Sequence, residues 1–171
     1  MSDVGWLRRR ERVPDEVREA ASVPHGERVL ASCRSGESGY LVASDCAFYV
    51  VSPPDSQRVR WDLVDRAAWK PPFLTVSVYD PDSDSVQTRA LAADPDSDLP
   101  SVVRDRVTRT ILVNNRIDVP GGHARVVGRR DSDGGTLWWR VVHSTGVDRD
   151  DPAVKRAVQE ELGQLRSAMG V

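Results

Sequence analysis

The spacing of hydrophobic and polar residues changes from helical to strand-like early in the chain. Residues 14–21, "PDEVREAA", place apolar side chains at helical intervals behind a proline, which predicts a short helix. From Gly26 to residue 92 the period becomes two, in six short runs rich in β-branched and aromatic residues. Turn sequences such as "PPDS", "KPP" and "DPDSD" separate these runs. Short strands at such even intervals predict antiparallel hairpins that form a barrel or a sandwich.

The second half of the chain returns to helical spacing, then alternates, and ends in a helix. "DSDLPSVVRDRVTRT" predicts a helix that ends near residue 110 or extends to Val113. The next stretch, "ILVNNRIDV", alternates like a strand, and "ARVVGRR" and "TLWWRVVHS" predict two more strands. Asp151 and Pro152 begin an amphipathic terminal helix. Its apolar stripe consists of Val154, Val158, Leu162, Leu165 and Met169.

Two adjacent tryptophans lie in the last predicted strand, where neighbouring side chains point to opposite faces. A two-residue type I′ turn at 133–134 places Trp139 opposite Gly128 and Trp138 opposite Arg129. The face that carries Trp139 also carries Ala124, Val126, Leu137 and Val141, which makes it a core face. We therefore expect the terminal helix to cover the Trp139 face.

The opposite face, which carries Trp138, combines an indole with arginines and is the main candidate binding site. Such side chains are enriched in protein interfaces, and they also hold single-stranded nucleic acids. The alternative is that this sheet packs back on the rest of the chain while the arginines extend their charged ends to solvent. The candidate residues are Trp138, Arg129, Arg140 and Arg125.

The N-terminal segment "WLRRRER" is a second candidate binding site. Its indole and its arginines, Trp6, Arg8, Arg9 and Arg10, suit an anionic membrane surface or a nucleic acid. A solvated tail is the commoner state of such a segment. The formal net charge of −2 also disfavours nucleic acid, because dedicated nucleic-acid binders are clearly basic.

Composition limits the compartment and the source. No apolar run reaches the length of a membrane span, and none follows the N-terminal arginines as a secretory signal requires, so we expect a cytoplasmic protein. Cys33 and Cys46 lie in apolar, strand-like contexts, which predicts two buried, reduced thiols. Lys70 and Lys155 are the only lysines among 24 basic residues, an arginine bias that indicates a high-GC bacterial source.

The sequence contains no pattern typical of catalysis, a metal site or a cofactor site. Nucleophile-elbow, phosphate-loop and dinucleotide-binding motifs are absent, and His25, His123 and His143 are not spaced as metal ligands. The pentapeptide "DPDSD" occurs at 80–84 and 94–98, but neither copy continues with the glycine and glutamate of a calcium loop. Asx turns account for both copies. We expect a protein that is not an enzyme and binds no cofactor.

Several features of residues 26–110 occur together in one known fold. They are a Gly-Glu-Arg-Val-Leu strand at 26–30, Ser-Asp at 44–45, Phe-Tyr at 48–49, and the step from Trp61 to Asp65. This region resembles the bacterial PH-like and GRAM-like domains. The resemblance implies seven strands and a closing helix that offer a platform for peptide or protein partners. Many such domains bind phosphoinositides through a loop that matches "SCRSGESGY" here, where Arg34 is the only cation. The whole chain also resembles a family of uncharacterised actinobacterial proteins.

The predicted fold is α+β in three segments. Residues 1–25 form an N-terminal tail and short helix, residues 26–110 a PH-like antiparallel β-barrel with its closing helix, and residues 111–171 a β-meander with a C-terminal amphipathic helix. The leading functional hypothesis is a non-catalytic cytoplasmic binding or scaffolding module that acts through protein–protein contacts, with an unknown protein or a second copy as partner.

Two alternatives belong to other classes of function. One is a nucleic-acid-binding accessory protein that uses the Trp138 face, and the other is a small-ligand or lipid-binding PH-like module. A large apolar cavity favours the ligand, and a contiguous basic stripe favours nucleic acid. An exposed apolar patch without either favours a protein partner.

Overall fold

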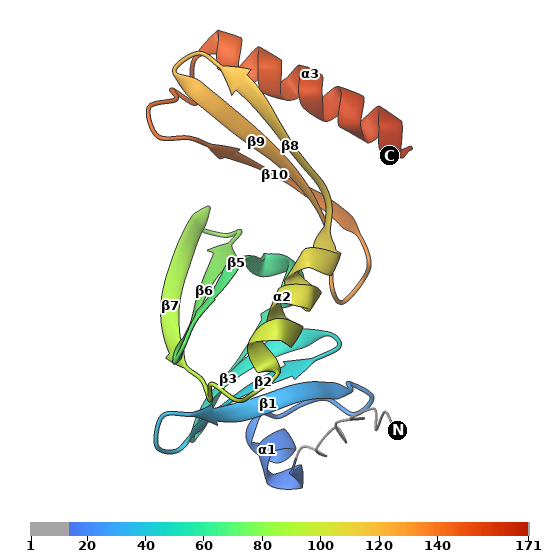
Figure 1. Ribbon diagram of the computed structural model, residues 1–171. Coiled ribbons are helices and arrows are strands. Elements are labelled where there is room, and N and C mark those ends of the chain that lie inside the picture. The colour runs from blue at the N-terminus through green and yellow to red at the C-terminus, as the bar shows by residue number, and fades with distance from the viewer. Residues whose placement is uncertain (1–13, 171) are drawn as a thin grey trace, which may run out of the picture.

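The computed structural model describes residues 14–170, which form three antiparallel sheets and three α-helices (Figure 1). After α1 (Asp15–Ala20), the first sheet contains β1 (Val29–Ser35), β2 (Gly39–Ser44), β3 (Ala47–Ser52) and β4 (Asp55–Arg60). The second sheet contains β5 (Val64–Lys70), β6 (Phe73–Asp80) and β7 (Ser85–Ala92), and α2 (Leu99–Thr110) follows it. The third contains β8 (Ile111–Val119), β9 (Gly122–Arg130) and β10 (Leu137–His143), and α3 (Pro152–Met169) ends the described chain.

The main hydrophobic core lies between the first two sheets and α2. Leu41 and Phe48 from the first sheet meet Val64 and Leu74 from the second, and Val103 of α2 completes the cluster. The opposite face of β2 and β3 is covered by α1, as the helical spacing of residues 14–21 predicts. In Figure 1 α1 lies at one end of the molecule, and the third sheet with α3 lies at the other end.

The first two sheets do not close into the predicted barrel. The run "RVRWDLV", expected as one strand, is interrupted by the 3₁₀ helix η1 (Trp61–Leu63), so that its two halves belong to different sheets. Trp61 is buried at this corner, and its Nε1 donates a hydrogen bond of 3.1 Å to the carbonyl oxygen of Ser44. Among the described strands, β4 and β7 therefore remain edge strands. The α+β class is confirmed, but the closed barrel is wrong.

The register of the last hairpin is confirmed, but its turn differs from the prediction. Trp138 pairs with Arg129 and Trp139 with Gly128. The strands are joined by a six-residue loop, 131–136, instead of a two-residue turn. The carboxylate of Asp131 accepts hydrogen bonds from the backbone N–H groups of residues 133 and 134, which stabilises this longer loop.

The terminal helix is confirmed with its predicted ends. Asp151 Oδ1 accepts a hydrogen bond of 2.7 Å from the Ala153 N–H, and Gly170 ends the helix in the left-handed conformation, with φ of 73°. Val154 and Val158 are buried, as the stripe predicts. The apolar stripe becomes more exposed toward the C-terminal end of α3, where Leu162 and Leu165 are half-buried and Met169 is 38% exposed.

Two further expectations are settled by the backbone and by burial. The helix α2 ends at Thr110 and does not extend to Val113, because the chain enters the extended conformation at residue 111. Both cysteines are free, but only Cys33 is buried. Cys46 is half-exposed because it lies in the bend between β2 and β3 and not within a strand.

No helix within residues 14–170 has both the length and the apolar character to cross a bilayer.

Candidate functional site

The Trp138 face of the third sheet lies against η1 and the second sheet. The Trp138 ring stacks on that of Tyr79, with 5.9 Å between centroids and 13° between planes. Its Nε1 donates a hydrogen bond of 2.9 Å to Oδ2 of Asp62. The Arg140 guanidinium lies 3.9 Å from the Tyr79 ring centroid, and its Nη1 lies 2.7 Å from Asp65 Oδ1. Both side chains therefore serve a contact within the chain.

Arg129 lies still deeper in this interface and is 5% exposed. Its Nη1 donates to the carbonyl oxygen of Val64 at 2.9 Å and to Oγ1 of Thr110 at 3.1 Å, and its Nη2 donates to the carbonyl oxygen of Asp65 at 3.2 Å. Burial lowers the pKa of this guanidinium. The guanidinium fork thus joins the third sheet to the start of β5 and to the end of α2.

Arg125 is the one described candidate residue that does not join this interface. Arg125 is on the same face of the sheet but is exposed. Trp6, Arg8, Arg9 and Arg10 lie outside the described residues. The structure therefore brings together three of the four predicted residues of the Trp138 face, and it uses them internally, as the alternative of packing against the rest of the chain requires.

Asp62 is the centre of the polar contacts between η1 and the 131–136 loop. Its side chain is fully buried, and it accepts hydrogen bonds from Arg60, from Trp138 and from both the N–H and the hydroxyl of Ser132. Burial alone would raise the pKa of Asp62, but the hydrogen bonds from Arg60 and Ser132 outweigh it and hold the pKa below the ordinary value. A buried carboxylate with this many donors stays ionised.

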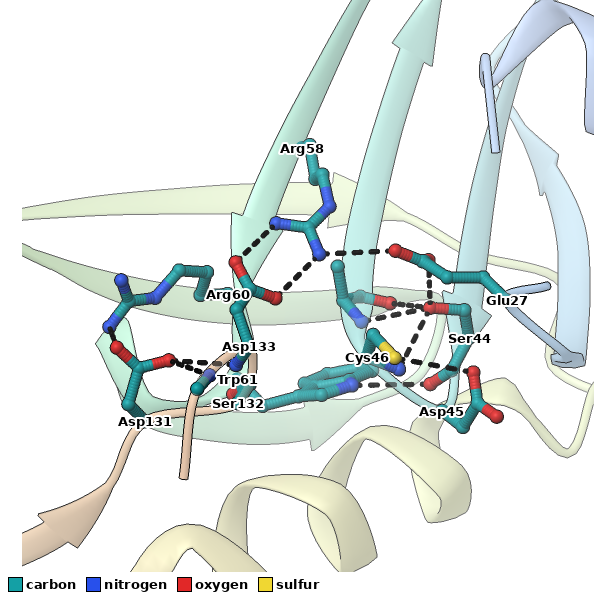
Figure 2. Close-up of polar contacts among 12 residues, drawn as sticks. Glu27, Ser44, Asp45, Cys46, Arg58, Arg60, Trp61, Asp131, Ser132 and Asp133 are labelled. Carbon is teal, nitrogen blue, oxygen red and sulfur yellow. Dashed lines mark hydrogen bonds and ion pairs between the residues drawn. The ribbon is translucent and has the colours of Figure 1, made fainter. Parts of the chain in front are cut away.

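Arg58 forms a second set of contacts beside the first (Figure 2). Its guanidinium lies 2.8 Å from Asp133 Oδ1 and 3.1 Å from Glu27 Oε1, and its Nε donates to the hydroxyl of Tyr49. The hydrogen bond from Arg58 lowers the pKa of Asp133. Burial and the hydrogen bond to Glu27 raise the pKa of Tyr49 to about 12. All these charges are paired within the chain, which marks the network as an interface rather than a reactive centre.

A cleft of about 400 Å³ opens between the first and second sheets. Its apolar lining comes from β3 and β4 on one side and from β6 and β7 on the other, with Phe48, Val50, Val59, Val76, Val78 and Leu91 as members. The volume falls within the range of about 300–1,000 Å³ that small-molecule sites occupy. The cleft exists because β4 and β7 do not pair with each other and the core between the sheets is left partly uncovered.

The polar side chains that line the cleft lie in two places, on the edge strands β4 and β7 and near the turn between β6 and β7. Arg89 of β7 donates a hydrogen bond of 2.8 Å to Oε1 of Gln57 on β4, so one side-chain contact bridges the two edge strands. Asp80 and Asp82 line the cleft near the β6–β7 turn. The Asp80 carboxylate accepts hydrogen bonds from the backbone N–H of Asp82 and the hydroxyl of Ser83, which form an Asx turn as the "DPDSD" sequence predicts.

Reasoning from the sequence alone missed the cleft and its lining. The signal available was the strand "SVQTRALA", which places Gln87 and Arg89 on the face that should have been apolar in a closed barrel. A charged residue that points inward is typical of an edge strand. Residues 14–170 contain no group of three His, Cys, Asp or Glu side chains arranged to hold a metal ion.

The comparisons with known proteins are negative. Neither the protein-family models, nor the curated proteins, nor the solved structures include a match to this chain.

Proposed function

We propose that this protein is a non-catalytic binding module whose cleft between the first two sheets takes a small, largely apolar ligand. The observation that carries the proposal is the cleft of about 400 Å³, which has an apolar lining and a few polar side chains at its edge. That combination is the common form of a small-molecule site. Residues 26–110 resemble PH-like domains, but a fold does not by itself assign a function, so the proposal rests on the cleft and its lining.

The interface network supports the proposal in a second way. A ligand site is effective when the elements that line it are held rigidly before binding. The third sheet fixes η1 and β5 through Asp62, Val64 and Asp65, and these residues lie at the corner from which the first two sheets diverge. The third sheet and α3 then act as a support for the cleft.

The test is binding of an uncharged fluorescent probe, N-phenyl-1-naphthylamine, to the purified chain. We expect saturable binding with one site per chain, and a loss of affinity of tenfold or more in Val78→Trp, because the larger ring fills the apolar cleft. The matched control is Leu112→Trp on β8, where a residue already 38% exposed is changed outside the cleft. Absence of probe binding in the wild type would overturn the proposal, as would equal affinities of the wild type and Val78→Trp.

A second candidate function, self-association, is favoured by the edge of the third sheet. Among the described strands β8 is an edge strand, and it carries Arg116, Ile117 and Asp118 in succession. If two copies of β8 pair antiparallel with Ile117 at the centre, Arg116 of each copy lies opposite Asp118 of the other. Opposite charges in directly facing positions stabilise a strand pair by about 0.2–1 kcal/mol.

Light scattering coupled to size-exclusion chromatography tests this second candidate. We expect a dimer that dissociates in Asp118→Arg, where arginines face arginines, and that re-forms in the charge-swapped double variant Arg116→Asp/Asp118→Arg. A wild-type monomer at every accessible concentration would rule out this pairing.

A further inference from the structure

We propose that the cleft selects an amphipathic carboxylate, with the hydrocarbon part on the apolar lining and the carboxylate at Arg89. This inference rests on the proposed function and names the chemical class of the ligand. The cleft needs a polar group in its ligand because its mouth is lined by polar side chains, and the charge of those side chains decides which group.

Arg89 is the cation placed to meet such a group. It is exposed, and it faces Val76, a buried residue of the cleft lining, across the β6–β7 ladder. Its one recorded partner within residues 14–170 is the neutral amide of Gln57. A guanidinium has five N–H donors in a planar fork, and that fork matches the two oxygens of a carboxylate. Most of the donors of Arg89 are therefore available to an anion.

The other charges of the cleft favour the same orientation of the ligand. Arg58 is already neutralised by Glu27 and Asp133. Asp80 lies at the far end of the β6–β7 ladder, four positions from Val76, which corresponds to about 13 Å along a strand. An anionic head is thus attracted at Arg89 and repelled at the turn, while the hydrocarbon part contacts Val78, which lies between Arg89 and the turn in the ladder.

If Arg89 serves only to keep the edge strand β7 from pairing with another chain, substitutions at this position should have different effects. A charge on an edge strand discourages pairing with another chain, and any charged side chain serves that purpose. Recognition of a carboxylate requires a positive charge, and recognition through two parallel hydrogen bonds requires the guanidinium fork. Lysine and glutamate at position 89 therefore separate the two roles.

The experiment compares decanoate with decanol, which share a hydrocarbon tail and differ in the head, as competitors of the fluorescent probe near neutral pH. We expect the wild type to bind decanoate about tenfold more tightly than decanol, as a charge-assisted hydrogen-bonded pair implies. Arg89→Met should bind decanol as the wild type does but lose the preference for decanoate. Arg89→Lys should reduce that preference, and Arg89→Glu should reverse it, so that decanol binds more tightly than decanoate. The control is Arg104→Met, an exposed cation on α2 outside the cleft.

The outcomes separate this inference from the proposed function. Equal affinities for decanoate and decanol, unchanged in Arg89→Met, would overturn the proposed selectivity for a carboxylate. The proposed function of the cleft as an apolar ligand site would still stand. Failure of probe and both competitors to bind would overturn both. Binding to phosphatidylcholine vesicles that contain phosphatidylglycerol, without binding of free decanoate, would also overturn the inference, because the anion would then be read at a membrane surface. Thermal melts of each variant verify that it is folded.

Discussion

The indole Nε1 of Trp138 donates a hydrogen bond to the carboxylate of Asp62, 76 residues earlier in the chain, at 2.9 Å. This bond joins the third sheet to the corner between the first two sheets. It also answers how two adjacent tryptophans are accommodated in one strand: Trp139 lies over Gly128 on the face toward α3, and Trp138 closes the interface with η1 and β6.

Trp138→Phe should destabilise the protein by about 1–3 kcal/mol, because a buried carboxylate then loses a hydrogen-bond donor while the stacking on Tyr79 is kept. Urea unfolding measures the change. Trp139→Phe is the matched control, since the Trp139 indole makes no hydrogen bond within residues 14–170, and it should cost less than about 1 kcal/mol. A larger loss in Trp139→Phe than in Trp138→Phe would contradict this interpretation.

Asp62 should make the stability of the protein sensitive to acid. Its pKa is lower in the folded chain than the ordinary value of about 3.9, so the unfolded chain takes up a proton first as the pH falls. The stabilisation is therefore complete above about pH 5 and is lost as the pH falls through the folded pKa. Asp62→Asn should flatten the dependence of the unfolding free energy on pH between about pH 5 and pH 3.

Asp133 supplies the comparison for that titration. The hydrogen bond from Arg58 lowers the pKa of Asp133, so this carboxylate shifts in the same direction as Asp62. The Asp133 side chain is 45% exposed, however, so solvent weakens the effect. Asp133→Asn should flatten the pH dependence less than Asp62→Asn. Identical profiles for wild type and Asp62→Asn would show that the buried carboxylate is not linked to folding.

Arg129→Lys should cost about 1–3 kcal/mol although it keeps the positive charge. An ammonium group cannot reproduce the fork that reaches Val64, Asp65 and Thr110, so at least one buried acceptor loses its donor. Arg130→Lys, at the exposed neighbouring position, should change the stability by no more than about 0.5 kcal/mol. Equal effects of the two substitutions would argue against the buried contacts of Arg129.

Gly128→Ala should destabilise the protein because the Trp139 ring lies where the new methyl group must go. A Cβ at position 128 would stand 3.0 Å from Cζ3 of Trp139, tighter than ordinary contact. We expect a loss of about 1–3 kcal/mol, as for other overpacked positions. In a Trp139→Leu background the same substitution should become neutral or stabilising, because alanine is better than glycine within a strand by about 0.5–1 kcal/mol. A double-mutant cycle measures the coupling.

The sequence by itself determined the order of the elements and the local geometry that nearest neighbours decide. The turn position at 133–134 predicted the β9–β10 register, in which Trp139 faces Gly128, although the loop is longer than predicted, and the cap at Asp151 predicted where α3 begins. Short-range patterns suffice here because each ladder partner or capping group is close in the chain, and a shift of one residue would turn every side chain to the wrong face.

Only the tertiary structure decided what covers each face and where the molecule stays open. The hydrogen-bond partners of Trp138 and Arg129 on η1 and β5 are 64 to 76 residues away, and no local period encodes a contact over that distance. The division of "RVRWDLV" follows from burial of Trp61 at the corner, which separates the two sheets and leaves β4 and β7 as edge strands. The cleft beside Arg89 is a consequence of that separation, because closure of the sheets would have filled it with side chains.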